Sequence, residues 1–177
     1  MPIRKSFIFV EGQDDKLFFE KIVLPIFKRR NITVSLRMYA NDKPQEFAKF
    51  IRSLKQMNLD YILIADKNSE QICITAKKEN VQKCYENEVE TDKIIVVVRE
   101  IESWYLSGLI EEHAKKLNLP LLENTENVGK KKFDQYRRNC RIPNRKYLMK
   151  EILKYFSIKT AKQKNTSFMY FADKYQL

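Results

Sequence analysis

Glycine, proline, cysteine and histidine are all scarce in this sequence. Its 177 residues include 3 Gly, 5 Pro, 3 Cys and a single His. So few turn-forming residues predict much regular structure, and the chain has neither a GxxxxGK[ST] nor a GxGxxG phosphate loop. Because His113 stands alone, we discount a zinc site and a Ser-His-Asp triad.

Long apolar runs are also missing. No run approaches the roughly 20 residues that a membrane span requires, and an expected strand begins almost at the N-terminus, so no secretory signal is visible. Cys73, Cys84 and Cys140 are odd in number and lack CxxC spacing. We therefore expect a cytoplasmic protein whose cysteines are reduced and act as small apolar residues.

The positive charge is confined to the C-terminal third of the chain. Residues 1–112 hold 18 basic and 18 acidic side chains, whereas residues 113–177 hold 16 basic and 5 acidic ones. The net charge of +11 therefore arises after residue 112. A phosphate polymer or an acidic partner is the natural counterpart of such a segment, although a lysine-rich surface can serve solubility alone.

The first hundred residues alternate between strand and helix patterns. We predict strands over 6–10, 33–39, 61–65 and 93–98, and helices over 14–29, 44–57 and 74–85. The run 93–98, KIIVVV, is apolar after its first residue, as expected of a strand covered on both faces. This alternation predicts an α/β fold with a mostly parallel sheet and helices on both faces.

The pattern becomes helical and basic after Glu100. We predict helices over 101–110, 145–156 and 167–175, and residues 129–139 form a segment rich in lysine and arginine. The expected organisation is an α/β core over 1–112 and a basic helical extension over 113–177, packed on the core as a single structural unit.

Acidic residues follow three of the predicted strands. Glu11 ends the first strand, Asp66 the third, and Glu100 and Glu102 follow the fourth. In open parallel sheets, ligands bind at the carboxyl ends of the strands. Carboxylates gathered there need a cation, and oxygen ligands suit Mg²⁺ or Mn²⁺.

Each of these residues also has a purely structural interpretation. Asp14 and Asp15, like Glu100 and Glu102, can be first-turn acids that favour a helix dipole. Asp66, Asn68 and Ser69 can form a polar turn, and the only tryptophan, Trp104, is expected in the core.

Two segments resemble the Toprim domain, which is shared by primases, topoisomerases and several nucleases. These are FVEGQDD and LIADKNS, each at a strand end. Glu11 matches the strand-end glutamate of that family, Asp15 the acid four residues later, and Asp66 the first Asp of its DxD motif. Asn68 stands where the second Asp would be, which removes one charge from the expected metal site and puts two-metal catalysis in doubt. The resemblance implies a Toprim, or Rossmann-like, fold.

The later segment REIESWYLSG resembles the E-x-W-x-L segment of small stand-alone Toprim proteins related to the OLD-family nucleases. Glu102 occupies the place of their site acid. Those relatives also carry a basic residue in the C-terminal helices, which Lys146 matches best and Lys159 and Lys162 match less well. The resemblance implies a separate ATPase subunit as a partner.

Together these features predict a metal-dependent nuclease that cleaves phosphodiester bonds in DNA or RNA. The predicted catalytic residues are Glu11, Asp66, Glu102 and Lys146, with Lys146 neutralising charge on the transition state. The predicted ligands of Mg²⁺ or Mn²⁺ are Glu11, Asp15, Asp66, Asn68, Glu100 and Glu102. The predicted nucleic-acid contacts are Lys130, Lys131, Lys132, Arg137, Arg138, Arg141, Lys159 and Lys162. Phe133, Tyr136 and Tyr147 lie among them and would stack on unpaired bases if exposed, or else belong to the core.

Two other functions remain open. A non-catalytic Toprim-like module would bind nucleic acid through the basic segment and ignore Mg²⁺. A phospho-acceptor receiver domain also pairs acids after its first strand with an Asp after its third. Arg99 and Glu100 at the end of the fourth strand suit such a receiver poorly.

Overall fold

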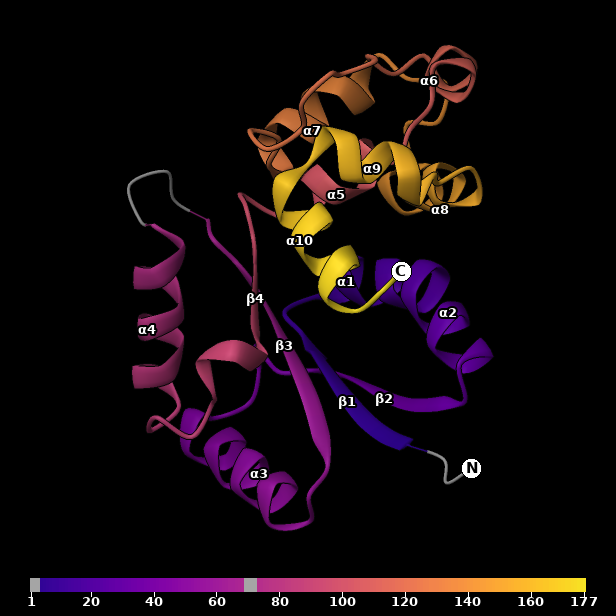
Figure 1. Ribbon diagram of the computed structural model, residues 1–177. Coiled ribbons are helices and arrows are strands. Elements are labelled where there is room, and N and C mark those ends of the chain that lie inside the picture. The colour runs from indigo at the N-terminus through magenta and orange to yellow at the C-terminus, as the bar shows by residue number, and fades with distance from the viewer. Residues whose placement is uncertain (1–3, 69–72) are drawn as a thin grey trace. The chain divides into compact units, whose positions relative to one another are not determined.

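The computed structural model describes residues 4–68 and 73–177, so Ser69 lies outside the described residues. The chain divides into two compact units, Met1–Val96 and Val97–Leu177 (Figure 1). The boundary falls within a strand rather than at residue 112. Residues 97–112, which we expected to belong to the α/β core, group with the helical unit instead.

The first unit is built on a four-stranded parallel sheet. Its strands are β1 (Arg4–Val10), β2 (Ile32–Met38), β3 (Asp60–Asp66) and β4 (Ile94–Val97), in the order β2-β1-β3-β4. Phe9 of β1 lies opposite Arg37 of β2 and Leu63 of β3. The prediction of an α/β fold with a parallel sheet is confirmed.

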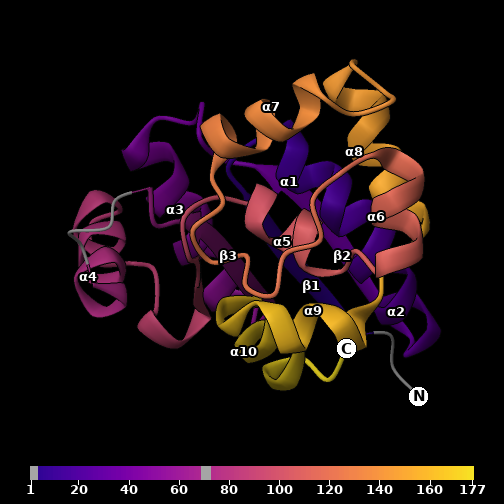
Figure 2. The ribbon, with the colours of Figure 1, turned by 90° about the horizontal axis from the view of Figure 1, so that it is seen from above.

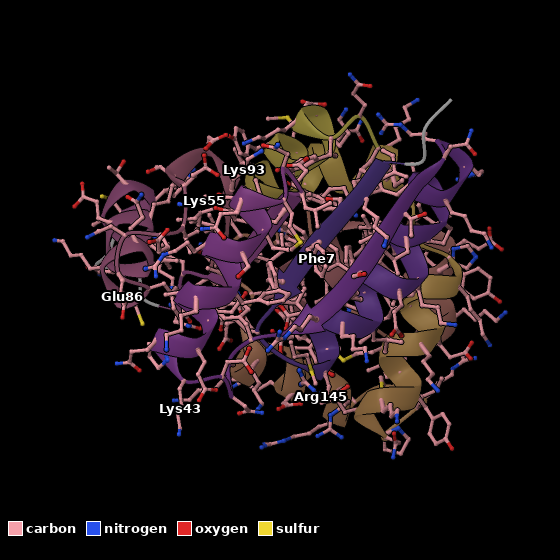
Figure 3. The ribbon with its side chains drawn as sticks, turned by 90° about the horizontal axis from the view of Figure 1, so that it is seen from below. Phe7, Lys43, Lys55, Glu86, Lys93 and Arg145 are labelled. Carbon is pink, nitrogen blue, oxygen red and sulfur yellow. The ribbon has the colours of Figure 1, made fainter. Side chains whose placement is uncertain are left out.

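One face of the sheet packs against α3 (Pro44–Gln56) and α4 (Ile74–Cys84). Phe9 contacts Phe47 of α3 edge to face, with ring centroids 5.0 Å apart. Phe7, two residues earlier on β1, lies on the same face and meets Phe50 in the same way at 5.6 Å (Figure 3). Side chains two residues apart on a strand share a face, which explains why these aromatic rings form one cluster.

The other face of the sheet is covered by the predicted helix 14–29 (Figure 1). It consists of α1 (Gln13–Phe18), a π-helical turn η1 (Phe19–Val23) and α2 (Leu24–Arg29). The π turn ends at Val23, two residues before Pro25, which is the second residue of α2. Because proline has no N–H to donate and its ring crowds the preceding turn, a regular α-helix cannot pass through it undisturbed.

The second unit is helical. Its elements are α5 (Glu102–Ser107), α6 (Glu111–Leu117), α7 (Lys130–Arg138), α8 (Arg145–Lys154), α9 (Ile158–Lys164) and α10 (Thr166–Lys174). All six residues of α5 are buried, and this helix lies at the centre of the unit with α8 and α9 against it (Figure 2). Trp104 is wholly buried and donates its indole N–H to Ser167 Oγ at 2.9 Å, so it is a core residue.

The sequence did not predict α6, α7 and α9 individually, and α7 was identified only as a segment rich in lysine and arginine. All three are short and lie in polar stretches, so none shows the repeated apolar spacing of a longer helix. The predicted strand 93–98 is shorter than expected, because a 3₁₀ turn, η2 (Thr91–Lys93), precedes β4. Within the described ranges 4–68 and 73–177, no helix is both long enough and apolar enough to cross a membrane.

Candidate functional site

Glu11 and Asp66 meet at the carboxyl edge of the sheet, as the sequence predicted. Their strands, β1 and β3, are adjacent and parallel, so both chains leave the sheet at the same edge. The Asp66 backbone N–H donates to Glu11 Oε1 at 3.0 Å. The Asp66 side chain is buried and that of Glu11 is half-buried. Two acidic residues far apart in sequence thus occupy neighbouring strand ends.

Tyr39, at the end of a third strand, β2, lies beside this pair of residues. This residue directly follows β2, and its N–H donates to Val10 O at 3.1 Å. Its hydroxyl lies 3.0 Å from Ile64 O and 3.4 Å from Glu11 Oε1. Burial, and secondarily the negative charge of Glu11, raises the pKa of the Tyr39 hydroxyl well above its ordinary value, so the group remains a proton donor.

Asp15 supports the turn between β1 and α1. Its Oδ2 accepts a hydrogen bond from the Gly12 N–H at 3.2 Å, at the start of the helix. The side chain is buried. The structural interpretation of Asp15 as a first-turn acid is therefore confirmed. A role in holding a metal remains a prediction.

The described residues contain no group of three or more His, Cys, Asp or Glu side chains arranged to hold a metal ion. Glu11 and Asp66 nevertheless fit the chemistry of Mg²⁺, which proteins commonly bind through one or two carboxylates while water and substrate phosphates complete the shell. Asn68 is exposed, with a backbone φ of 62°, in the left-handed region that asparagine tolerates better than most residues.

Glu100 contacts the beginning of α7. Its Oε2 accepts a hydrogen bond from the Lys130 N–H, the first residue of the helix. Gly129 precedes this residue, and a Cβ there would lie 2.5 Å from Glu100 Oε2. Glycine is therefore the residue that lets the carboxylate approach the helix end, where the dipole favours negative charge.

Glu102 is buried and forms an ion pair with Arg145. The same guanidinium contacts Asp134 Oδ1 at 2.9 Å and lies over the Phe133 ring, 5.0 Å from its centroid. Arg137 also contacts Asp134 Oδ1, at 3.1 Å. These charges join α5, α7 and α8 within the second unit.

Desolvation raises the pKa of the Glu102 carboxyl, while the charge of Arg145 opposes that effect. Sequence reasoning missed Arg145 and selected its neighbour, Lys146, which is exposed. Both stand in the same PNRKYL segment, and no pattern in the sequence indicates which of the two turns toward Glu102. Glu100 and Glu102 belong to the second unit, and their roles in a metal site with Glu11 remain predictions.

The predicted nucleic-acid contacts differ in their surroundings. Five of the basic residues in and after α7 are exposed, namely Lys130, Lys131, Lys132, Arg138 and Arg141. Lys159 is exposed too, whereas Lys162 pairs with Asp173. Of the three aromatic residues among them, Phe133 is buried, Tyr136 is partly buried and Tyr147 is exposed.

Comparison of the chain with protein-family models, curated proteins and solved structures found no match in any of the three. The Toprim resemblance therefore rests on the motifs around Glu11, Asp66 and Glu102.

Proposed function

We propose that the protein is a divalent-cation-dependent phosphodiesterase that acts on nucleic acid, with its site at the carboxyl edge of β1 and β3. The observation that supports it most is the hydrogen bond from the Asp66 backbone to Glu11, which brings two acidic strand ends together. Without a counter-ion, such a pair of carboxylates repel each other.

Glu11 and Asp66 would hold the cation. Asp15 stabilises the turn between β1 and α1, next to Glu11. A bound Mg²⁺ or Mn²⁺ would supply positive charge to the scissile phosphate and acidity to a water molecule. The protonated Tyr39 hydroxyl holds the strand ends together. The surplus of basic residues after residue 112 would attract the phosphate backbone without selecting a sequence.

The test uses plasmid DNA, single-stranded DNA and structured RNA, each incubated with Mg²⁺, Mn²⁺ or EDTA. Glu11→Gln is the sharpest variant, because the amide oxygen can still accept from Asp66 N–H while the charge is lost. We expect cleavage that EDTA abolishes and that Glu11→Gln or Asp66→Asn reduces by at least about 100-fold. Mn²⁺ binding followed by electron paramagnetic resonance should weaken in the same variants.

Glu20→Gln is the control for net charge, since Glu20 is exposed and pairs with Lys16 on the same helical segment. It should cleave as the wild type does. Full activity in Glu11→Gln and Asp66→Asn would remove both residues from the site.

A non-catalytic nucleic-acid-binding module is the second candidate. It is favoured by the concentration of basic residues after residue 112. Binding that persists in EDTA, with no cleavage in any metal, would identify this function.

A further inference from the structure

The first turn of α8 presents an aromatic ring to solvent. Tyr147 is 64% exposed, the largest value among the exposed large hydrophobic side chains of the described residues. An aromatic ring that is mostly exposed contributes little burial free energy to the fold and leaves a flat apolar surface accessible to a ligand.

Basic residues lie near this ring. Lys146 precedes it and is exposed, and the Lys150 ammonium, about one turn further along α8, lies over the ring at 6.0 Å from its centroid. Exposed Arg141 lies shortly before the helix. A π surface bordered by cations is complementary to a nucleotide, whose base is flat and whose phosphate is negative.

The Tyr147 ring belongs to the first turn of α8, which several hydrogen bonds and ion pairs hold in place. Asn144 Oδ1 accepts from the Tyr147 backbone N–H at 3.1 Å and caps α8. Arg145 is tied to Glu102 and Asp134, and Arg137 donates to Pro143 O just before the cap. The opposite side of α8 is buried through Leu148, Met149, Ile152 and Leu153. A ligand that stacks on Tyr147 therefore need not order the backbone beneath it.

We propose that Tyr147 is a stacking platform for an unpaired base, with Lys146 and Lys150 binding the adjacent phosphates. The inference rests on the proposed function in taking nucleic acid as the ligand, and it specifies single-stranded regions rather than duplex. In a duplex the bases already stack on one another, so their faces are closed to a side chain at the surface.

The test is fluorescence anisotropy in EDTA, where cleavage cannot interfere. The probes are a fluorescein-labelled 20-nucleotide oligo(dT), an abasic oligonucleotide of the same length and a blunt duplex. Tyr147→Ala should weaken oligo(dT) binding by about 5- to 150-fold and leave binding of the abasic and duplex probes unchanged. Tyr147→Phe retains the ring and should bind oligo(dT) as the wild type does.

Tyr170 provides a matched control. It is 50% exposed, and the Lys174 ammonium lies 5.8 Å from its ring centroid, but it is on α10. Tyr170→Ala should leave oligo(dT) affinity unchanged. Circular dichroism of each variant checks that the helices are intact.

Several results would overturn the assignment. These are unchanged oligo(dT) affinity in Tyr147→Ala, an equal loss for all three probes, or no binding of the wild type to any probe. If the protein cleaves nucleic acid in a metal-dependent manner but Tyr147→Ala leaves oligo(dT) affinity unchanged, the stacking role of Tyr147 is rejected and the proposed phosphodiesterase activity is not. Tyr147-dependent binding without any cleavage would reject only the phosphodiesterase.

Discussion

At the scale of single residues, Gly129 shows how one missing Cβ can decide a contact. Glu100 reaches the Lys130 N–H across the space that a side chain at position 129 would occupy. A carboxylate at a helix start satisfies a backbone donor that the helix itself leaves open.

We predict that Gly129→Ala lowers the free energy of unfolding by about 1 kcal/mol, because Glu100 must withdraw from the helix. Thermal denaturation measures the loss. Gly12→Ala is the matched control, since Gly12 is also a helix N-cap and its added Cβ would meet only Asp15 Oδ2, at 3.5 Å. In a Glu100→Ala background, Gly129→Ala should cost less than it does in the wild type. Equal costs in both backgrounds would show that Glu100 is not the cause.

The residues of the candidate site were only partly predictable. Glu11 and Asp66 could be paired from sequence because parallel strands deliver their ends to one edge of the sheet. Arg145 could not be distinguished from Lys146, because the direction of a side chain on a short helix depends on packing around it. Tyr39 ends the predicted strand 33–39, so it was expected at the same edge of the sheet, but its contact with Glu11 was missed because the sequence does not give the order of the strands or the direction of the side chain.

At the scale of elements, α3 is joined to the segment after α4 by charges around Glu88. Its Oε1 lies 2.8 Å from Arg52 Nη2, and its Oε2 lies 2.8 Å from Lys55 Nζ. Figure 3 marks Lys43 at the start of α3 and Lys55 toward its end. Hydrogen bonds from Lys55 and Arg52 lower the pKa of the Glu88 carboxyl.

This contact predicts a pH effect on stability. Since the folded carboxyl binds its proton more weakly than the unfolded one, its contribution is present above the unfolded pKa and is lost as the pH falls through the folded pKa. Glu88→Gln should therefore lower the melting temperature at pH 7 and by less at pH 3. Glu86→Gln is the control, because Glu86 lies 3.7 Å from Arg52 Nη2 and is more exposed. An equal shift at both pH values would contradict the charge-based explanation.

Elements with a strong periodic pattern were predictable and short ones were not. The strands and the helix α3 were predicted to within a residue or two, because apolar spacing and Pro44 define them. The short helix α9 begins at Ser157, whose Oγ accepts a hydrogen bond from Thr160 N–H, whereas α6 begins after Ile110 without a side-chain cap. Such a cap has a weak sequence signal when no apolar stripe follows it.

At the scale of the whole molecule, charge is distributed unevenly along the chain. Residues 1–112 carry no net charge, and the excess of basic residues lies beyond residue 112. Binding to a polyanion through such residues releases counter-ions and therefore weakens as salt is added.

We predict that Lys130→Gln, Lys131→Gln and Lys132→Gln together weaken polynucleotide binding and reduce the slope of log affinity against log salt by up to about 2 for a single strand. The control is the same change of charge at Lys43, Lys49 and Lys83, exposed lysines of the first unit. Salt titrations monitored by anisotropy compare the two triple variants. Equal slopes would assign the binding to net charge alone.

Glu11 is oriented by a hydrogen bond from the main chain of residue 66, and this determines which substitutions at that position preserve the contact. Because the donor is the amide of position 66 and not its side chain, any residue except proline supplies it. The acidity of one strand end can thus be varied, by mutation or by evolution, without releasing the other from its place. At position 66 the side chain can change while the backbone hydrogen bond to Glu11 is kept.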